Sequence, residues 1–279
     1  MHPVLDFLQL LGFLCYTCLR AIFLTIIPVS WHSKNVRGQV CWISGAGNGI
    51  GKQMAIKFSV LGCRMVLIDI NKGWLEKTAK ECKDAGAETV DVYVCDLSDR
   101  EQVYLMAEKV KKDVGPVDIL INNAGIVSAK PLLELDDAAN IERTFKINAI
   151  SHFWTIKAFL PDMLRRERGH IVTIASMAGI TCASGKLMDY AASKYAAVGI
   201  GETLEFELRC VYKTNKIKST VVCPYYINTG MFQGVSLKYE WLLPYLTPDF
   251  VAQQTVDAVL TNKPMVMLPA WLRIIAILK

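Results

Sequence analysis

The sequence lacks any concentration of charge. Its 279 residues carry a formal net charge of +5, and the Lys and Arg residues are spread along the chain rather than clustered in a stripe with interleaved aromatics. This pattern argues against nucleic acid as a partner. The sequence also lacks a Pro/Gly/Ser-rich linker, an internal repeat and a low-complexity tract. Because 52% of the residues are hydrophobic, the chain can bury a large core, and one α/β domain is the simplest interpretation.

The nine cysteines lack a recurring spacing. Their number is odd, and most of them lie inside apolar runs. Such usage is typical of reduced cysteines in a core rather than of disulfides or a metal site. We therefore expect no metal ion, and we expect the catalytic part of the chain to face a reducing compartment.

The N-terminus differs from the rest of the chain. Residues 4–29 are apolar apart from Asp6, Gln9 and Arg20, and a polar, basic stretch follows them. The length is sufficient to cross a bilayer, but Arg20 makes a simple span costly, so a helix in the membrane interface or a hairpin in one leaflet is an alternative. A buried core helix is another alternative, whereas a cleaved signal peptide fits worse because no small-x-small site follows a short apolar core. We predict a membrane anchor over residues 1–30.

Between these residues and the C-terminus the hydrophobic pattern alternates. Short apolar or β-branched runs are separated by segments of helical period, such as residues 74–85 and 100–114. Runs that are apolar on both faces suit a parallel sheet with helices on either side. We therefore predict a single α/β domain over residues 37–264, built on a Rossmann-type doubly wound parallel sheet. A second apolar stretch, residues 265–279, is a candidate for contact with the same membrane.

A glycine-rich turn, SGAGNGIG at residues 44–51, follows the first predicted strand. Its bare backbone can approach a pyrophosphate closely, and the helix that begins near Ile50 offers amide donors and a positive dipole end. Close packing of a strand against a helix is the structural alternative. The turn alone therefore does not establish a dinucleotide site, which also requires residues that can bind the rest of the dinucleotide.

Asp69 provides part of that context. It ends the second predicted strand, 18 residues after Gly51, where an acid can accept hydrogen bonds from the ribose hydroxyls of adenosine and would repel a 2′-phosphate. Lys52 and Lys72 lie close by in sequence and would offset part of this repulsion. The pattern favours NAD over NADP.

A second constellation, YAASK, contains Tyr190 and Lys194. Positions i and i+4 of a helix share a face, so the hydroxyl and the ammonium can converge on one site. A nearby cation favours the phenolate, as a general base near neutral pH requires. A solvated helix face is the usual alternative for such a pair. Here Ser176 ends a predicted strand at the carboxyl edge of the sheet, where α/β enzymes place their chemistry.

These motifs together resemble the short-chain dehydrogenase/reductase family. The resemblance rests on the glycine spacing of residues 45–51, on NNAG at residues 122–125, on a Ser at the end of the fifth strand and on Tyr-x3-Lys, in that order over residues 38–263. It implies a one-domain Rossmann fold with a catalytic tetrad. The residues at the tetrad positions are Asn148, Ser176, Tyr190 and Lys194.

The resemblance implies a role for each member of this tetrad. Tyr190 would take the proton of a substrate alcohol while hydride leaves the same carbon for a nicotinamide, and Lys194 would favour the phenolate and bind the nicotinamide ribose. Ser176 would donate a hydrogen bond to the substrate oxygen. Asn148 would hold a water that connects Lys194 with solvent. Asn122, in contrast, is expected to tie neighbouring strands together.

The resemblance also implies which residues hold NAD. Asp96 matches the residue that holds adenine, and Thr229 matches the residue that contacts the nicotinamide carboxamide. The expected cofactor-binding residues are Ser44, Gly45, Asn48, Gly49, Ile50, Gly51, Asp69, Asp96, Leu97, Asn123, Tyr190, Lys194 and Thr229.

The chain departs from the family pattern at several points. Ser176 precedes Tyr190 by 14 residues, one more than is usual, and Ser184 in the intervening loop is a weaker candidate for the same role. Tyr225 occupies the position after a proline where the family usually has Gly. Members of the anchored branch usually continue beyond the position of Lys279.

Within the family, the apolar N-terminus and residues 152–161, 227–234 and 258–265 resemble a membrane-associated branch. That branch contains the epidermal retinol dehydrogenases and the 17-beta-hydroxysteroid dehydrogenases of lipid droplets. Residues 231–250 occupy the place of the family's substrate lid, and their apolar character suits a lipophilic alcohol, although ordinary core packing is the alternative for each single aromatic.

The resulting prediction is NAD-dependent oxidation of all-trans-retinol to retinal. The enzyme would act at the cytosolic face of the endoplasmic reticulum membrane or at a lipid droplet, and the resemblance implies a homodimer. A 17-beta-hydroxysteroid is the alternative substrate. A membrane or lipid-droplet scaffold without catalytic activity is the alternative from another functional class.

Overall fold

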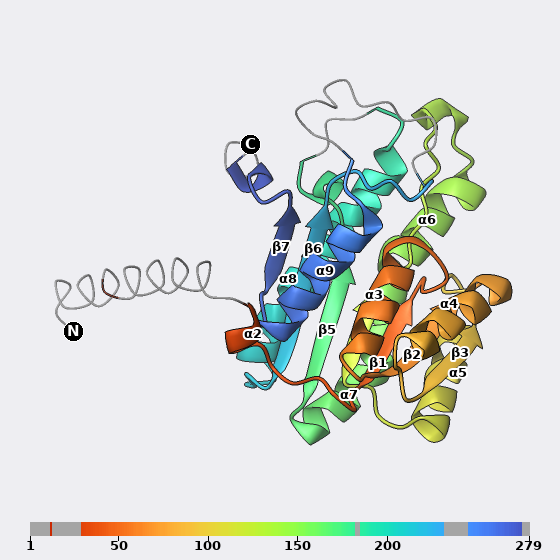
Figure 1. Ribbon diagram of the computed structural model, residues 1–279. Helices are drawn as coiled ribbons and strands as arrows, with labels where there is room; N and C mark the ends of the chain where they lie inside the picture. The colour runs from red at the N-terminus through yellow and green to blue at the C-terminus, as the bar shows by residue number, and fades with distance from the viewer. Residues whose placement is uncertain (1–11, 13–28, 182–184, 232–244, 275–279) are drawn as a thin grey trace. The chain divides into compact units, whose positions relative to one another are not determined.

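The computed structural model describes Gly12 and residues 29–181, 185–231 and 245–274 (Figure 1). The chain divides after Asn35 into two units, and the unit that begins at Val36 contains the whole sheet. Within the described ranges, no helix combines the length and the apolar character needed to cross a bilayer. The predicted anchor lies outside the described residues apart from Gly12 and the start of the short helix α2 (Val29–His32).

A sheet of seven parallel strands forms the centre of the second unit, in the order β3-β2-β1-β4-β5-β6-β7 (Figure 1). The order reverses direction between β1 and β4, the point outside which ligands bind in open α/β sheets. The predicted Rossmann-type sheet in a single domain is therefore confirmed. The strands are β1 (Val40–Ser44), β2 (Arg64–Asp69), β3 (Val90–Val94), β4 (Ile119–Asn122), β5 (Gly169–Ile174), β6 (Ile217–Pro224) and β7 (Met265–Leu268).

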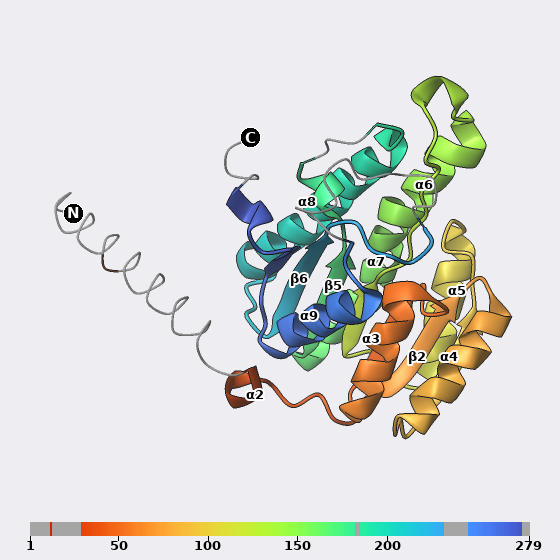
Figure 2. The same cartoon turned by 45° about the horizontal axis from the view of Figure 1, so that its top comes forward.

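Helices cover both faces of the sheet (Figure 2). Alternate residues of a central strand point to opposite layers, so Ile43 packs in one core and Trp42 in the other. Because both faces are buried, the strands have continuous apolar sequences. The helices of the first layer are α3 (Gly49–Val60), α4 (Lys72–Asp84) and α9 (Pro248–Leu260), and those of the second layer are α5 (Arg100–Asp113), α7 (Ser151–Arg166) and α8 (Met188–Cys210).

Polar side chains define where several of these helices begin. Asn48, Asn71, Asp99 and Thr247 precede α3, α4, α5 and α9, and each accepts a hydrogen bond from an amide of the first turn. Such caps satisfy N–H groups that have no partner within the helix. The predicted bounds of α4 and α5 accordingly lie within two residues of the observed ones.

Irregular helical turns lie between the regular elements. They are the 3-10 helices η1 (Leu132–Glu134) and η4 (Met177–Gly179), the short helix α6 (Arg143–Phe145), and the π-helical segments η2 (Asp137–Glu142) and η3 (Lys146–Ile150) on either side of it. The segment η3 leads directly into α7 and contains Asn148. Short π-helical turns occur often at functional sites.

The C-terminal region differs from the prediction at its start. Met265–Leu268, included in the predicted apolar end segment, form strand β7 and pair with β6. Periodicity cannot distinguish an apolar run of four residues in an edge strand from the start of a longer apolar segment. These four residues therefore belong to the sheet.

Candidate functional site

A cavity of about 670 Å³ opens at the carboxyl ends of the central strands. It extends from the glycine-rich turn after β1 to the first turns of α8. The structure places most of the predicted site residues on its wall, while Ser44, Gly51 and Asn148 do not line it. The predicted residues on the wall are Gly45, Asn48, Gly49, Ile50, Asp69, Asp96, Leu97, Asn123, Ser176, Tyr190, Lys194 and Thr229.

The glycine-rich turn uses its glycines for conformation and for close approach. Gly45 and Gly49 have φ angles of +63° and +56°, in the left-handed region that favours glycine. A Cβ on Gly51 would collide with the carbonyl oxygen of Gly45 and would lie 2.6 Å from the side-chain nitrogen of Asn123. Gly51 therefore lets α3 pack against the turn. The turn and the start of α3 form a cradle of the kind that holds a pyrophosphate.

Ser44 and Asn123 join the two strands beside the switch point. The Ser44 hydroxyl donates to the carbonyl oxygen of Ile121 (3.3 Å) and accepts from the amide of Asn123 (2.9 Å). The Asn123 side chain donates to the carbonyl oxygens of Ser44 (2.8 Å) and Gly45 (3.1 Å). Ser44 thus supports the turn from behind, and Asn123 both supports it and lines the cavity.

Asp69 lies directly against the glycine-rich turn. One carboxylate oxygen accepts a hydrogen bond from the amide of Gly47 (2.9 Å), and the other accepts one from the amide of Asn71 (3.0 Å). A carboxylate oxygen can accept two hydrogen bonds, so each keeps capacity for a hydroxyl in the cavity. The nearby lysines are paired with other acids, since Lys52 lies 2.7 Å from Glu81 and Lys72 lies 3.7 Å from Glu76.

Arg143 is a cavity residue that the sequence analysis missed. Its guanidinium lies 3.6 Å from the Asp96 carboxylate, which also accepts hydrogen bonds from the amide and the hydroxyl of Ser98 at 2.9 and 2.7 Å. Arg143 belongs to α6, between the π-helical segments. No sequence signal marked it, because its approach to Asp96 depends on how the irregular segment folds back over the end of β3.

Lys194 and Tyr190 meet at the wall of the cavity. The Lys194 ammonium lies 5.8 Å from the centre of the Tyr190 ring and donates a 2.8 Å hydrogen bond to the carbonyl oxygen of Ile174. Both side chains are buried. Burial lowers the pKa of Lys194 to about 8, and the Cys223 thiol acts in the opposite direction. Because this pKa is close to neutral pH, the charge of Lys194 depends on the groups that surround it.

Ser176 lies on the same wall, at the end of β5. Its hydroxyl accepts a hydrogen bond from the amide of Ala178 (3.1 Å) and makes a long contact with the carbonyl oxygen of Pro224 (3.4 Å). The hydroxyl is therefore oriented by the turn η4 that follows it. Ser184, the weaker candidate, lies outside the described residues.

Asn148 lies behind the wall rather than on it. Its amide oxygen accepts from the backbone N–H of Ile126 (2.8 Å), and its amide nitrogen donates to the carbonyl oxygen of Ile126 (2.9 Å) and to the hydroxyl of Ser193 (3.0 Å). A Cβ on Gly125 would lie 3.4 Å from the Asn148 oxygen and 3.5 Å from the Lys194 nitrogen. The Asn148 side chain therefore holds the loop after β4 against α8, directly beside Lys194.

The rest of the wall is mainly apolar, and apart from Met231, which begins the predicted lid, these residues were not among the predicted site residues. Tyr225, the departure from the family pattern, lies among them, and its ring packs edge-on against Tyr226 with centroids 5.0 Å apart. Burial raises the pKa of Tyr225. Most of the predicted lid, residues 232–244, lies outside the described residues. The apolar lining includes Val127, Ile174, Ala175, Tyr225, Ile227 and Met231.

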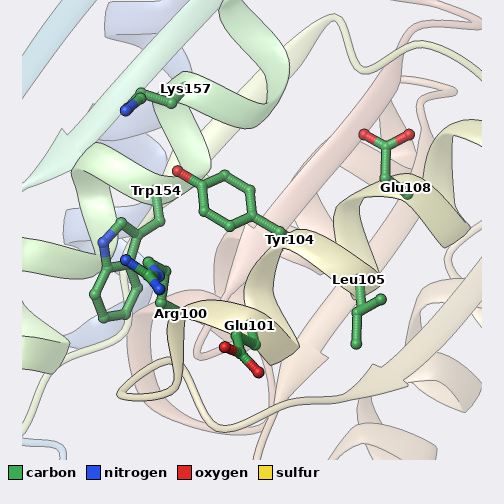
Figure 3. Close-up of a pocket in the computed structure, with 7 residues that line it drawn as sticks. All are labelled: Arg100, Glu101, Tyr104, Leu105, Glu108, Trp154 and Lys157. Carbon is green, nitrogen blue, oxygen red and sulfur yellow. The ribbon is translucent and has the colours of Figure 1, made fainter.

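A second hollow, of about 720 Å³, lies on the outer surface between α5 and α7 (Figure 3). Tyr104 points from α5 toward α7 (Figure 3). The hollow is lined by both acidic and basic side chains. Its residues are Arg100, Glu101, Tyr104, Leu105, Glu108, Trp154 and Lys157. Across the described part of the chain, no group of three or more His, Cys, Asp or Glu side chains is arranged to hold a metal ion.

Comparisons with known proteins agree with this geometry. The family model for short chain dehydrogenases matches residues 39–240. The chain is 44% identical over 279 residues to bovine (Bos taurus) short-chain dehydrogenase/reductase family 16C member 6, with 100% of this chain and 87% of the relative covered. It is 43% identical over 269 residues to human (Homo sapiens) epidermal retinol dehydrogenase 2, covering 96% and 85%. Rat (Rattus norvegicus) 17-beta-hydroxysteroid dehydrogenase 13 is 42% identical over 274 residues, covering 98% and 88%.

Solved structures show the same fold with either nicotinamide dinucleotide. A short-chain dehydrogenase/reductase from Burkholderia phymatum in complex with NAD is 27% identical and superposes with a TM-score of 0.78, covering 88% of this chain and 94% of that one. A metagenomic short-chain oxidoreductase in complex with NADP is also 27% identical, with a TM-score of 0.69 and coverage of 84% and 97%.

Proposed function

The chain belongs to the short-chain dehydrogenase family, and from that premise we propose that it oxidises all-trans-retinol to retinal with NAD. The observation that carries this proposal is that Tyr190, Lys194 and Ser176 line one cavity together with apolar residues such as Ile174, Tyr225, Ile227 and Met231. A reactive hydroxyl would lie at the polar wall while a long hydrocarbon occupies the apolar part.

The residues on the polar wall divide the chemistry among them. The Tyr190 oxygen takes the proton of the alcohol, because the adjacent Lys194 ammonium stabilises the phenolate. The Ser176 hydroxyl donates a hydrogen bond to the same substrate oxygen and stabilises its developing charge. A nicotinamide dinucleotide held along the glycine-rich turn, Asp69 and Thr229 would supply the hydride acceptor. Asn148 positions the loop that packs against Lys194, and any proton relay at this residue would use its main chain, since its side-chain amide is engaged with protein groups.

The cavity fits a dinucleotide, and its charges favour NAD. A Cβ at Gly51 would collide with the Gly45 carbonyl oxygen in the turn, and a Cβ at Gly49 would lie 3.3 Å from the Thr229 side chain. Asp69 presents a carboxylate where the adenosine ribose of such folds lies. Because Lys52 and Lys72 are both paired with glutamates, they offset little of its repulsion of a 2′-phosphate.

The lipophilic substrate is supported by the lining of the cavity and by relatives. Two of the similar proteins are named as a retinol dehydrogenase and a 17-beta-hydroxysteroid dehydrogenase. Both names refer to hydrophobic alcohols, which agrees with the apolar lining around Ile227 and Met231. The chain would act at the endoplasmic reticulum membrane or a lipid droplet, anchored by residues 1–30, with residues 37–264 facing the cytosol.

Surface features support contacts with lipid and with a second copy. Exposed Trp271 and Ile274 follow β7 and offer apolar side chains for a membrane contact. The hollow between α5 and α7 carries both signs of charge, Arg100 and Lys157 with Glu101 and Glu108 (Figure 3). The family commonly pairs through the helices around Asn148 and Tyr190, so we place the homodimer contact on α7 and α8, where Phe153 and Phe206 are exposed, rather than in this hollow.

The proposal is tested with full-length protein in membranes. Formation of NADH or NADPH is followed after addition of all-trans-retinol, a 17-beta-hydroxysteroid or a short-chain alcohol, each with NAD or with NADP. We expect the largest kcat/KM with retinol and NAD. A larger kcat/KM with the steroid would show that a steroid is the preferred substrate. Absence of turnover with every lipophilic alcohol would favour a scaffold protein without catalytic activity.

A further inference from the structure

Arg143 is a charged cavity residue to which the proposed chemistry gives no role. Among the described residues that line the cavity, the basic side chains are Arg143 and Lys194, and the acidic ones are Asp69 and Asp96. Lys194 is bound to the end of β5, whereas Asp96, the partner of Arg143, follows the end of β3. The strands β2, β1 and β4 lie between β3 and β5 in the sheet. The two cations therefore lie at different ends of the cavity.

The Arg143 side chain keeps its capacity to donate hydrogen bonds. The described residues give its guanidinium one ion pair, 3.6 Å from an Asp96 carboxylate oxygen, and no hydrogen bond. The side chain is 48% exposed although it lines the cavity. Because a guanidinium has five N–H donors and no acceptor, Arg143 offers the cavity donors that protein groups do not use.

Asp96 supplies the complementary acceptor. One of its carboxylate oxygens accepts hydrogen bonds from the amide of Ser98 at 2.9 Å and from its hydroxyl at 2.7 Å. The other oxygen faces Arg143 and accepts no hydrogen bond from the described residues. A free acceptor and a free donor thus lie side by side on the wall of the cavity.

The position of Arg143 is set by the buried side of α6. Thr144 is fully buried, and its hydroxyl donates a 3.2 Å hydrogen bond to the buried carboxylate of Asp189 on α8. Arg143 and Ile147, which are four residues apart and so share a helical face, both line the cavity. Lys146 is not on the wall and pairs with the acid four residues before it (3.3 Å). One face of this irregular segment is therefore directed at the cavity.

We propose that Arg143 binds the adenine base of the dinucleotide together with Asp96, donating to a ring nitrogen beside the amino group that the free Asp96 oxygen accepts. Adenine presents an amino donor next to a ring-nitrogen acceptor, an edge that proteins bind with an acceptor and a donor side by side, as in the amide of Asn or Gln. Here a carboxylate and a guanidinium supply the two groups. This inference rests on the proposed use of a nicotinamide dinucleotide.

The test measures binding without an alcohol, by calorimetry on the full-length protein in lipid nanodiscs. The ligands are NADH, NADPH and ADP-ribose, which contains the adenine and the pyrophosphate and lacks the nicotinamide. In Arg143→Met the Kd of NADH and that of ADP-ribose should both rise by about tenfold or more, as expected from the loss of a hydrogen bond with a charged donor. An unchanged Kd for ADP-ribose would overturn the proposal.

Two further variants separate the base from the phosphates as the partner of Arg143. Arg143→Gln keeps a planar group with N–H donors and removes the charge, whereas Arg143→Lys keeps the charge and removes the planar fork. The glutamine variant should recover part of the affinity for ADP-ribose, and the lysine variant should bind it as weakly as Arg143→Met. Tighter binding by the lysine variant than by the glutamine variant would assign the guanidinium to the pyrophosphate. A loss confined to NADPH would assign it to the 2′-phosphate, and either result would overturn the proposal.

Controls separate this role from a general effect of charge and from folding. Lys146→Met removes a cation three residues away that does not line the cavity, so the Kd of ADP-ribose should not change. An equal rise in Lys146→Met would contradict the assignment to Arg143. Thermal unfolding of ligand-free Arg143→Met should stay close to wild type, since a half-exposed ion pair contributes little. If that variant does not fold, the Kd of Arg143→Lys against wild type replaces it. Binding that depends on Arg143 in a chain that oxidises no alcohol would overturn the proposed function alone.

Discussion

The Lys194 ammonium lies 5.8 Å from the centre of the Tyr190 ring, while its nitrogen donates a 2.8 Å hydrogen bond to the Ile174 carbonyl oxygen. The lysine is thus fixed by the end of β5 rather than by the helix that carries it. Its ammonium cannot turn toward solvent without losing that bond. This arrangement keeps a cation beside the phenol and gives the proposed base its strength.

Replacing this lysine tests the electrostatic part of the mechanism. Burial lowers the pKa of Lys194 to about 8, so the charge is present below that pH and is lost above it. In Lys194→Met, kcat at pH 7 should fall by about a hundredfold or more, and the acid limb of its pH profile should move upward. Lys157→Met, at an exposed position of α7, serves as the control. An unshifted profile in Lys194→Met would contradict the role given to the ammonium.

The cofactor preference depends on Asp69. Asp69→Asn keeps the shape of the side chain and removes the charge that would repel a 2′-phosphate. We expect the ratio of kcat/KM for NAD to that for NADP to fall by about tenfold or more, equivalent to about 1.4 kcal/mol. Glu76→Gln, which changes an exposed acid on α4, should leave the ratio unchanged. The same ratio in both variants would show that Asp69 does not determine the preference for NAD over NADP.

The glycine-rich turn requires a bare position inside α3. In Gly51→Ala the new Cβ would collide with the Gly45 carbonyl oxygen, so the start of α3 must move, at a cost of about 1–3 kcal/mol. Thermal unfolding and fluorescence titration with NADH should show lower stability and weaker binding. Gly199→Ala is the matched control, because its Cβ would meet no atom within 4 Å. That helical substitution should raise stability by about 0.5–1 kcal/mol.

A buried carboxylate at the opposite end of the sheet supports the fold. Asp118 accepts hydrogen bonds from the amide of Val40 (3.0 Å) and from Arg166 (2.6 Å), and it lies 3.2 Å from Arg168. Asp118→Ala should lower the free energy of unfolding by about 3 kcal/mol, because a partly buried arginine and a buried amide lose their acceptor.

Denaturant unfolding compares this variant with Glu76→Ala, which removes an exposed pair with Lys72. The exposed pair should contribute less than about 1 kcal/mol. Equal effects of the two substitutions would show that the Asp118 cluster has no special importance for stability.

Local sequence patterns predicted the parts of this molecule that depend on nearby residues. Strands buried on both faces and helices with polar caps have signatures within a few residues, so the sheet and the bounds of α4 and α5 were predictable. Strand β7 was not recognised, because a four-residue apolar edge strand next to another apolar run has no distinct period. The π-helical turns around Asn148 were also missed, since they depend on packing between α7, α8 and the loop after β4.

The same division holds for the site. Glycine spacing and Tyr-x3-Lys are local, so the cavity wall from Gly45 to Lys194 was predicted. Arg143 reaches the cavity through tertiary packing, and no spacing in the sequence marks it. Asn148 was expected to hold a water, which stays a prediction, and its side-chain amide bonds to Ile126 and Ser193. The sequence predicted most of the site residues that line the cavity. The fold determines which atoms of each residue are free to bind a ligand.

In the proposed reaction the Tyr190 oxygen takes the proton of a bound lipophilic alcohol. The most direct measurement is NADH formation from all-trans-retinol and NAD by full-length protein in membranes, comparing wild type with Tyr190→Phe and confirming that both bind NADH equally. We expect the rate of NADH formation to fall by about a hundredfold or more in Tyr190→Phe. Equal rates in the two proteins would contradict it.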